Sequence, residues 1–235
     1  MSSDANFSRT AAFYDAAWSS EQPSCFADYP RNLLLARATR GWKGAGQTLV
    51  DVGCGPGTVA AYFSRLGYSV GGVDASPVAI ERARKDVPNG SFHVGNVEEP
   101  LPFASGSTDV VFWGDNVEHL FEPLRTLHEI RRILKPSGQL ILTCPNIAFW
   151  KFRLFYLLHG SPPRTEGHAN PPWSWEHIRF FNPGILRTFL RTGGFSVTEM
   201  TGTMDRRKPD FLARNIPSLF ATILLAIAEP LPEAQ

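Results

Sequence analysis

A glycine-rich turn follows an apolar run near residue 50. The sequence LVDVGCGPG (49–57) places Gly53, Cys54, Gly55 and Gly57 after residues typical of a buried strand, and helix-forming residues begin at Thr58. Glycine lets the backbone turn with positive φ and approach a ligand closely, and the first N–H groups of a helix have no partner within it. The turn therefore predicts a binding site for a nucleotide-containing cofactor.

Two carboxylates near this turn narrow the choice of cofactor. Asp74, which ends the next apolar run, is placed to accept hydrogen bonds from ribose hydroxyls, with Ala75 beside it. The dinucleotide fingerprint requires glycine at position 58, which is Thr58. Asp51 disfavours a pyrophosphate and favours the ammonium and sulfonium groups of S-adenosylmethionine. We therefore expect S-adenosylmethionine as the cofactor, and a nicotinamide-dependent reductase is the disfavoured alternative.

The surrounding sequence predicts a parallel sheet. Short apolar runs alternate with amphipathic stretches from residue 47 to about residue 201, which is typical of βαβ units. Runs such as VVFW and LIL lack polar alternation, so these strands are expected to be covered on both faces. Strands are predicted at residues 48–52, 69–74, 91–95, 109–113, 139–144 and 195–201.

Helix boundaries are marked by capping residues and proline. Ser76-Pro77 and Asn182-Pro183 each offer a capping side chain followed by proline at the first helical position. Residues 123–135 carry apolar side chains at three- and four-residue steps, which predicts a helix with one buried stripe. The sequence KPSG (135–138) is expected to end that helix.

Four segments resemble the class I S-adenosylmethionine-dependent methyltransferases over about residues 45–201. They are VDVGCGPG (50–57), GVDAS (72–76), GNVEEPLPF (95–103) and the region from DVVFWGDNVEHL to EIRRILKPSGQLILTCPN (109–146). The resemblance implies an α/β, Rossmann-like, doubly wound sheet of seven strands. Most strands are parallel, and an antiparallel last hairpin ends with a strand at residues 221–228.

The resemblance also implies further cofactor contacts. In this family the third segment contacts adenine, which assigns that role to Asn96 and Val97, with Asn96 standing where Asp is usual. Asparagine can still accept through its carbonyl oxygen or donate through its amide. Trp113 at the end of the fourth strand and Tyr14 in an aromatic N-terminal segment complete the expected contacts, with Tyr14 closing over the cofactor.

Within this family, three short motifs resemble one branch. EHL (118–120), PN (145–146) and HIRFF (177–181) are similar to segments of ubiquinone-pathway O-methyltransferases and of methyltransferase-like proteins linked to methionine biosynthesis. The resemblance implies a small-molecule acceptor, with O-methylation favoured.

A hydroxyl acceptor needs a base, and three histidines are candidates, with His119 and His177 preferred over His168. His119 follows the fourth strand at the carboxyl edge of the sheet, and His177 ends a stretch rich in Trp, Pro and His. The alternative is that His119 only hydrogen-bonds the loop backbone and His177 only packs. Asp115 and Glu118 with His119 offer a Mg²⁺ site as a further alternative. We predict no metal, because charged loop residues usually bind backbone or water.

The chain is predicted to form a single domain, residues 1–235. Its parts are an N-terminal helical cap (1–46), a cofactor-binding core (47–145), an acceptor-side insertion (146–181), and a final helix with the C-terminal strands (182–235). The insertion follows the fifth strand and is rich in aromatic residues, so we expect it to line the acceptor pocket.

Composition limits the partners and the compartment. The net charge of +1 gives no general attraction to nucleic acid, and three scattered cysteines predict free thiols. The polar N-terminus lacks a signal peptide, so a cytoplasmic location is expected. The apolar run 216–228 is too short to span a bilayer and is predicted to be a buried strand. Two alternative functions are a cofactor-binding module without turnover and a lipid-facing methyltransferase with an interfacial helix at 149–158.

Overall fold

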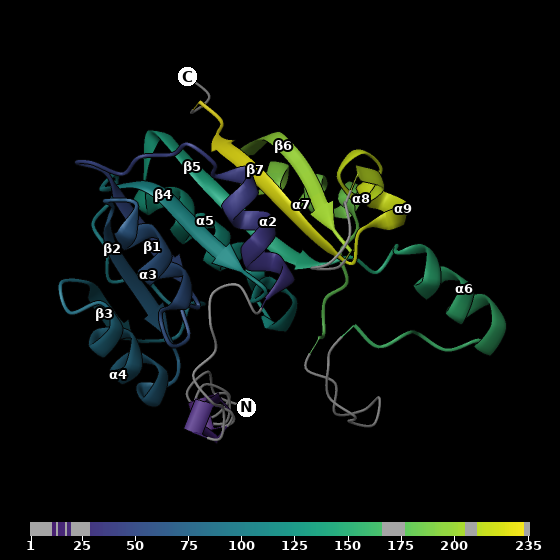
Figure 1. The fold of residues 1–235 in the computed structure, drawn as a ribbon, viewed down its shortest axis with the longest axis horizontal. Coiled ribbons are helices and arrows are strands. Elements are labelled where there is room, and N and C mark those ends of the chain that lie inside the picture. The colour runs from purple at the N-terminus through teal and green to yellow at the C-terminus, as the bar shows by residue number, and fades with distance from the viewer. Residues whose placement is uncertain are drawn as a thin grey trace.

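The computed structural model describes residues 11–12, 14–16, 18–19, 29–165, 177–204 and 211–232. Seven strands form one sheet in the order β3-β2-β1-β4-β5-β7-β6 (Figure 1). Strands β1 to β5 run parallel, whereas β7 is antiparallel to both β5 and β6. The predicted fold class is confirmed. The strands are β1 (Thr48–Val52), β2 (Ser69–Asp74), β3 (Ser91–Val94), β4 (Thr108–Gly114), β5 (Leu134–Pro145), β6 (Phe195–Thr203) and β7 (Ile223–Pro230).

Helices connect these strands, and the predicted caps are present. The Ser76 side chain accepts a hydrogen bond from the N–H of Ala79, and the Asn182 side chain accepts one from the N–H of Ile185. Each therefore satisfies an otherwise unpaired N–H group in the first turn of its helix. The helices are α2 (Pro30–Ala38), α3 (Thr58–Arg65), α4 (Pro77–Asp86), the 3₁₀ turn η2 (Val117–His119), α5 (Pro123–Ile133), α6 (Trp150–His159), α7 (Pro183–Thr192), α8 (Phe211–Asn215) and α9 (Pro217–Phe220).

Helices cover both faces of the sheet, as the apolar strands require. On one face α2, α3 and α4 pack over residues such as Leu49 and Phe112. On the other face α5 and α7 pack over residues such as Val50 and Trp113. Figure 1 shows α2 crossing in front of the sheet. Because neighbouring strand residues point to opposite faces, Phe112 and Trp113 belong to different cores.

Two predicted boundaries are wrong by several residues. The strand expected from residue 139 begins at Leu134, which pairs with Thr108. The KPSG segment (135–138) continues this strand, and the register of its pairing with β4 shifts between Thr108 and Val110. The run 216–228 is not all strand: Pro217 begins the short helix α9, and β7 starts only at Ile223. Proline fixes φ near the helical value and suits a first helical position.

Helix α6 stands apart from the sheet. It extends to one side of the molecule in Figure 1, and none of its residues is buried. Over the described residues, no helix is long and apolar enough to cross a membrane. Cys54 and Cys144 are buried free thiols, as expected, and Cys25 lies outside the described residues.

Candidate functional site

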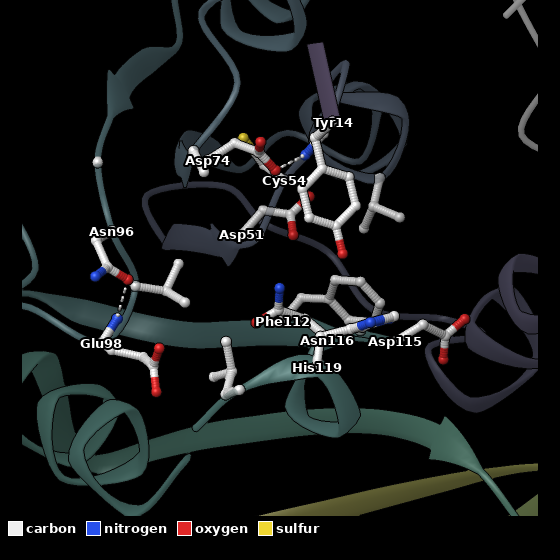
Figure 2. Close-up of a pocket in the computed structure, with 18 of the residues that line it drawn as sticks. Tyr14, Asp51, Cys54, Asp74, Asn96, Glu98, Phe112, Asp115, Asn116 and His119 are labelled. Atoms are coloured by element: carbon white, nitrogen blue, oxygen red, sulfur yellow. Dashed lines mark hydrogen bonds between the residues drawn. The ribbon is translucent and has the colours of Figure 1, made fainter. Parts of the chain in front are cut away.

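The carboxyl ends of β1, β2 and β4 meet beside a cavity of about 520 Å³ (Figure 2). This volume lies within the range of small-molecule and cofactor sites. Parallel strands place their carboxyl ends at one edge of the sheet, which explains how distant segments of the chain reach one cavity. Among the predicted cofactor contacts, the cavity is lined by Tyr14, Asp51, Gly53, Cys54, Gly55, Asp74, Ala75, Asn96 and Val97.

The glycine-rich turn has the backbone conformation that its sequence predicts. Gly53, Gly55 and Gly57 all have positive φ, and Gly57 is the N-cap of α3 at φ +81°. The turn is held to β2 by the N–H groups of Gly53 and Cys54, which both donate to the carbonyl of Val73. Gly57 does not line the cavity. A Cβ at that position would lie 2.8 Å from the Cβ of Ala83, so Gly57 allows the turn to pack against α4.

Asp74 and Asp51 bring negative charge to the cavity from adjacent strands. The Asp74 carboxylate accepts hydrogen bonds from the N–H groups of Gly55 at 2.8 Å and Ser76 at 2.9 Å, so it also fixes the turn. Burial raises the pKa of Asp74. Burial raises the pKa of Asp51 to about 7, with a smaller opposite effect from Arg31 and a further raising effect from Asp74. A bound cation would favour the ionised form of Asp51.

Asn96 and Val97 line the cavity, and Figure 2 shows Asn96 at the opposite end of the drawn residues from Asp115. The carbonyl oxygen of the Asn96 side chain accepts a hydrogen bond from the N–H of Glu98 at 3.0 Å. The side chain therefore holds its own loop as well as facing the cavity. Its contact with adenine stays a prediction.

The described N-terminal residues lie over the glycine-rich turn. Tyr14 and Trp18 line the cavity, and a Cβ at Gly55 would lie 3.0 Å from the Trp18 ring. Asp15 accepts hydrogen bonds from the Ser76 hydroxyl and from the N–H of Val78, at the first turn of α4. The segment has the position that a lid over the cofactor requires, and closure itself stays a prediction.

Arg31 is a cavity residue that the sequence interpretation missed. It lies in the first turn of α2, and its Nη1 is 3.3 Å from the Asp115 carboxylate. Asp115 has φ +46°, and its carboxylate accepts a hydrogen bond from the Thr143 hydroxyl at 2.9 Å. A non-glycine residue with positive φ costs free energy and is enriched at functional sites. The sequence signal that could have pointed to Arg31 was Pro30 after Tyr29, because proline is typical of the first position of a helix.

Trp113 does not contact the cavity, and its predicted cofactor contact is wrong. Its side chain is fully buried on the opposite face of the sheet, while Phe112 lines the cavity instead. The Trp113 ring N–H donates to the Asn116 side chain at 2.9 Å, which helps to hold the turn after β4. The alternation of side chains along a strand explains the one-residue error.

The two predicted catalytic histidines are adjacent, but only His119 lines the cavity. The ring centroids of His119 and His177 are 4.7 Å apart in an edge-to-face arrangement. Tyr14 lies on the cavity side of His119, with its ring centroid at 6.4 Å. His177 does not line the cavity itself but contacts His119, which does.

The described part of the insertion does not line this cavity. None of residues 146–165 or 177–181 belongs to the lining, whereas residues 166–176, including His168, Trp173 and Trp175, lie outside the described residues. The PN pair has a structural role: the Asn146 amide donates to the carbonyls of Pro217 and Ala221. The described parts of the insertion thus do not wall this cavity, because α6 extends away from the sheet, and the role of residues 146–181 in an acceptor pocket stays a prediction.

The three side chains expected to bind Mg²⁺ in the alternative interpretation do not all lie together. Among described residues, the ligand-type atoms that lie within 4.8 Å of one another come from Glu118, His119 and His177, and not from Asp115. The Asp115 carboxylate instead contacts Thr143 and Arg31. The predicted absence of a metal stays a prediction.

Comparison with known proteins identifies the class. The family model described as "Methyltransferase domain" matches residues 50–142. A ubiquinone biosynthesis O-methyltransferase of Caulobacter sp. (strain K31) is 31% identical over 179 residues, which cover 71% of this chain and 68% of that protein. The chain belongs to the class I S-adenosylmethionine-dependent methyltransferases. This methyltransferase therefore uses S-adenosylmethionine as its methyl donor.

Solved structures agree on the fold. An S-adenosylmethionine-dependent methyltransferase from Mesorhizobium loti has a TM-score of 0.63 and 17% identity, covering 86% of this chain and 99% of that one. A putative methyltransferase of Haloferax volcanii, solved with the Trm112 methyltransferase activator, has a TM-score of 0.62 and 22% identity over 99% of this methyltransferase and 97% of that chain. Because the chain belongs to the methyltransferases, we do not pursue the two alternatives, a nicotinamide-dependent reductase and a cofactor-binding module without turnover.

Proposed function

We propose that this methyltransferase O-methylates a small, apolar or aromatic acceptor that carries a hydroxyl. The observation that carries the proposal is the position of His119, a candidate base on the wall of the cofactor cavity. Aromatic rings of Tyr14, Tyr29 and Phe112 line the same cavity. Apolar walls with a few polar groups are typical of small-ligand pockets.

Different cavity residues are assigned to cofactor binding and to activation of the acceptor. Asp74 would hold the ribose, Asp51 would face the cationic groups of the cofactor, and Arg31 would offer a guanidinium to the carboxylate of the cofactor. The acceptor oxygen forms a bond to the methyl carbon as the carbon–sulfur bond breaks, and the electron pair of that bond stays on sulfur. The hydroxyl proton passes to His119. Because the displacement is in line, positioning of the two reactants accounts for most of the catalysis.

The curated relatives support a hydroxyl acceptor. Several are named ubiquinone biosynthesis O-methyltransferases, at 27 to 31% identity. Those names describe the relatives. For this chain they support an oxygen nucleophile on a ring-containing acceptor, and they make hydroxylated aromatic compounds the first set to assay.

An acceptor screen tests the proposal. The enzyme is incubated with S-adenosylmethionine and matched sets of hydroxylated aromatics and amines, and release of S-adenosylhomocysteine is measured. We expect turnover with the hydroxylated set and a lower kcat in His119→Gln at unchanged cofactor affinity. The exposed His128→Gln serves as control and should retain full activity. Turnover only with amines, or full activity in His119→Gln, contradicts the proposal.

A second candidate function is methylation at a lipid surface, favoured by helix α6. Its apolar side chains are exposed, with Leu157 at 78% and Leu158 at 69%, while Lys151 and Arg153 supply positive charge. Residues 147–165 contain no Asp or Glu. Interfacial helices combine these features. Co-sedimentation with anionic vesicles tests this candidate, with Leu157→Glu expected to abolish binding, and recovery of the protein in the supernatant contradicts it.

A further inference from the structure

Two segments of the chain are joined at the end of the cavity that Asn96 lines. They are the loop after β3 and the segment between η2 and α5. The N–H of Glu122 donates a hydrogen bond to Oε1 of Glu98, and the Arg125 guanidinium lies 3.6 Å from the Glu99 carboxylate. All of these residues line the cavity. The two segments therefore contribute jointly to the cavity wall, with both charged and hydrogen-bonding groups.

The order of the strands predicts which part of the cofactor lies here. Asp51 on β1 is predicted to face the sulfonium, and Asp74 at the end of β2 is predicted to hold the ribose. Adenine and sulfur are attached to opposite sides of the ribose, so adenine extends from β2 away from β1. The next strand is β3, and the N–H of Gly95 after it donates to the carbonyl of Asp74 at 2.9 Å. The loop after β3 is therefore expected to contact adenine.

The same end of the cavity has apolar lining. Val97 is 7% exposed and Leu120 is 8% exposed, and both line the cavity. A purine has apolar ring faces, and its hydrogen-bonding groups lie around its edge. Apolar contact with the ring faces does not distinguish one purine from another, because every base has such a face. Polar groups that meet the edge of the base must therefore provide the distinction.

Hydrogen bonds within the wall determine what Asn96 and Glu98 can offer to a base. The side-chain oxygen of Asn96 accepts from the N–H of Glu98 at 3.0 Å (Figure 2), which leaves the amide nitrogen, a donor, on the other side. Oε1 of Glu98 accepts from the N–H of Glu122, whereas no described residue donates to Oε2. A carboxylate oxygen can only accept. The wall thus offers one donor and one acceptor, two residues apart in the chain.

Adenine carries the complementary pair of groups, since its exocyclic amino group donates and the neighbouring ring nitrogen accepts. We propose that Glu98 determines specificity for the base: its Oε2 accepts a hydrogen bond from the amino group of adenine, while the Asn96 amide donates to a ring nitrogen. Hypoxanthine has an oxygen in place of this amino group, so it would place two acceptors against each other. This role concerns the cofactor alone and goes beyond the proposed function, because it does not depend on the methyl acceptor.

The alternative is a purely structural role, in which Glu98 only holds the backbone at Glu122. The variant Glu98→Gln separates the two roles. The single side-chain oxygen of glutamine can accept from the N–H of Glu122, and its NH₂ group then takes the position of Oε2. The variant therefore keeps the contact between the two segments and replaces an acceptor by a donor. Glu98 is only partly buried and glutamine has the same shape, so the variant should remain folded.

Calorimetry with two ligands tests the proposal without a methyl acceptor. The ligands are S-adenosylhomocysteine and S-inosylhomocysteine, which differ only in carrying adenine or hypoxanthine. We expect wild type to bind the adenosyl ligand about tenfold to a hundredfold more tightly, because hypoxanthine leaves polar groups without partners. In Glu98→Gln the adenosyl ligand should bind more weakly and the inosyl ligand more tightly, so that the ratio of the two affinities falls by about tenfold or more.

The matched control is Glu99→Gln. This variant makes the same chemical change at the neighbouring residue, whose carboxylate also lines the cavity but lies beside Arg125. We expect the wild-type ratio of affinities in this variant. A ratio that falls as much as in Glu98→Gln would contradict the assignment to Glu98.

Two further results would overturn the proposal. One is a wild-type protein that binds both ligands with affinities within about twofold of each other, which needs no variant. The other is an unchanged ratio in Glu98→Gln, because loss of a purely structural contact affects both ligands equally. Neither result bears on O-methylation, since the acceptor screen uses S-adenosylmethionine and wild-type protein. A screen that finds no hydroxyl acceptor likewise leaves the two affinities unaltered.

Discussion

Asp51 is a buried carboxyl whose charge should serve cofactor binding at a cost in stability. It lies in the strand before the glycine-rich turn and is 3% exposed. Burial raises its pKa from 3.8 to about 7. The substitution Asp51→Asn keeps the size of the side chain and its ability to accept a hydrogen bond, but removes the charge. We therefore expect the variant to be more stable without cofactor and to bind the cofactor less well.

The size of the stability effect follows from the pKa of Asp51 in the two states. Between pH 3.8 and about 7 the folded protein holds a proton on Asp51 that the unfolded chain has lost. The free energy of unfolding contributed by this group therefore falls as pH rises, and above about pH 7 the full loss remains. A shift of about three pH units corresponds to about 4 kcal/mol. The raised carboxyls of Asp74 and Glu118 are present in both proteins, so their effects largely cancel in the difference.

Urea unfolding of the cofactor-free proteins at pH 5, 6, 7 and 8 measures the effect. We expect Asp51→Asn to exceed wild type at pH 8 by up to about 4 kcal/mol, and the difference to shrink steadily toward pH 5. The exposed Asp86→Asn makes the same charge change at the surface and should show no such pH dependence. A variant that is less stable than wild type at pH 8, or a difference that does not vary with pH, would refute the reasoning.

Cofactor affinity is a second measurement on the same two proteins, in which the charge of Asp51 should be favourable. If Asp51 titrates near pH 7, it is about nine-tenths ionised at pH 8 and about one-tenth ionised at pH 6. The affinity of wild type for S-adenosylmethionine, divided by that of Asp51→Asn, should therefore fall about tenfold from pH 8 to pH 6. Titration of the cofactor's own amino group affects both proteins and cancels in this ratio. A constant ratio would remove Asp51 from the cationic part of the site.

Three further predictions concern the cofactor side of the cavity. Asp74→Ala should weaken binding of S-adenosylhomocysteine by roughly 1.5 to 3 kcal/mol in calorimetry, because hydrogen bonds to a charged group are lost; unchanged affinity would exclude Asp74 from the site. Gly57→Ala should destabilise the protein by about 1 to 3 kcal/mol, since the position has φ +81° and a Cβ would meet Ala83 at 2.8 Å. Gly106→Ala is its control, with φ +62° and open space, and should cost less in urea unfolding. Deletion of residues 1–20 should speed dissociation of S-adenosylhomocysteine in stopped-flow measurements without unfolding the sheet, and an unaltered rate in a folded truncation would reject the lid.

The cofactor side was predictable because its signals are local. The strand, the positive-φ glycines and the following helix occupy one continuous stretch, and Asp74 ends the very next strand. Backbone conformation and helix capping are set by nearby residues, so a sequence pattern is sufficient to predict them. The error at Trp113 is one residue long, because successive side chains of a strand point to opposite faces of the sheet. The register of β4 with its neighbours decides that Phe112, and not Trp113, faces the cavity.

The remaining site residues depend on contacts between distant parts of the chain. Arg31 reaches Asp115 from a helix 84 positions away, and no periodicity predicts that contact. The amphipathic pattern of residues 149–158 correctly predicts a helix, but the helix buries no residue, so amphipathicity gave the wrong expectation of where it packs. Hydrophobic pattern predicts what a segment can bury, and tertiary structure decides whether it does.

The arrangement of the cavity separates cofactor binding from acceptor activation along the chain. The turn at 53–57, Asp74 and Asn96 lie in or shortly after the first three strands, whereas the loop after His119 is hydrogen-bonded to a segment 58 positions further along the chain. A substitution in the HIRFF segment can therefore change the orientation of His119 while the glycine-rich turn and its hydrogen bonds to Val73 remain intact. We therefore expect substitutions in residues 177–181, none of which lines the cavity, to change turnover of the acceptor at constant affinity for S-adenosylmethionine.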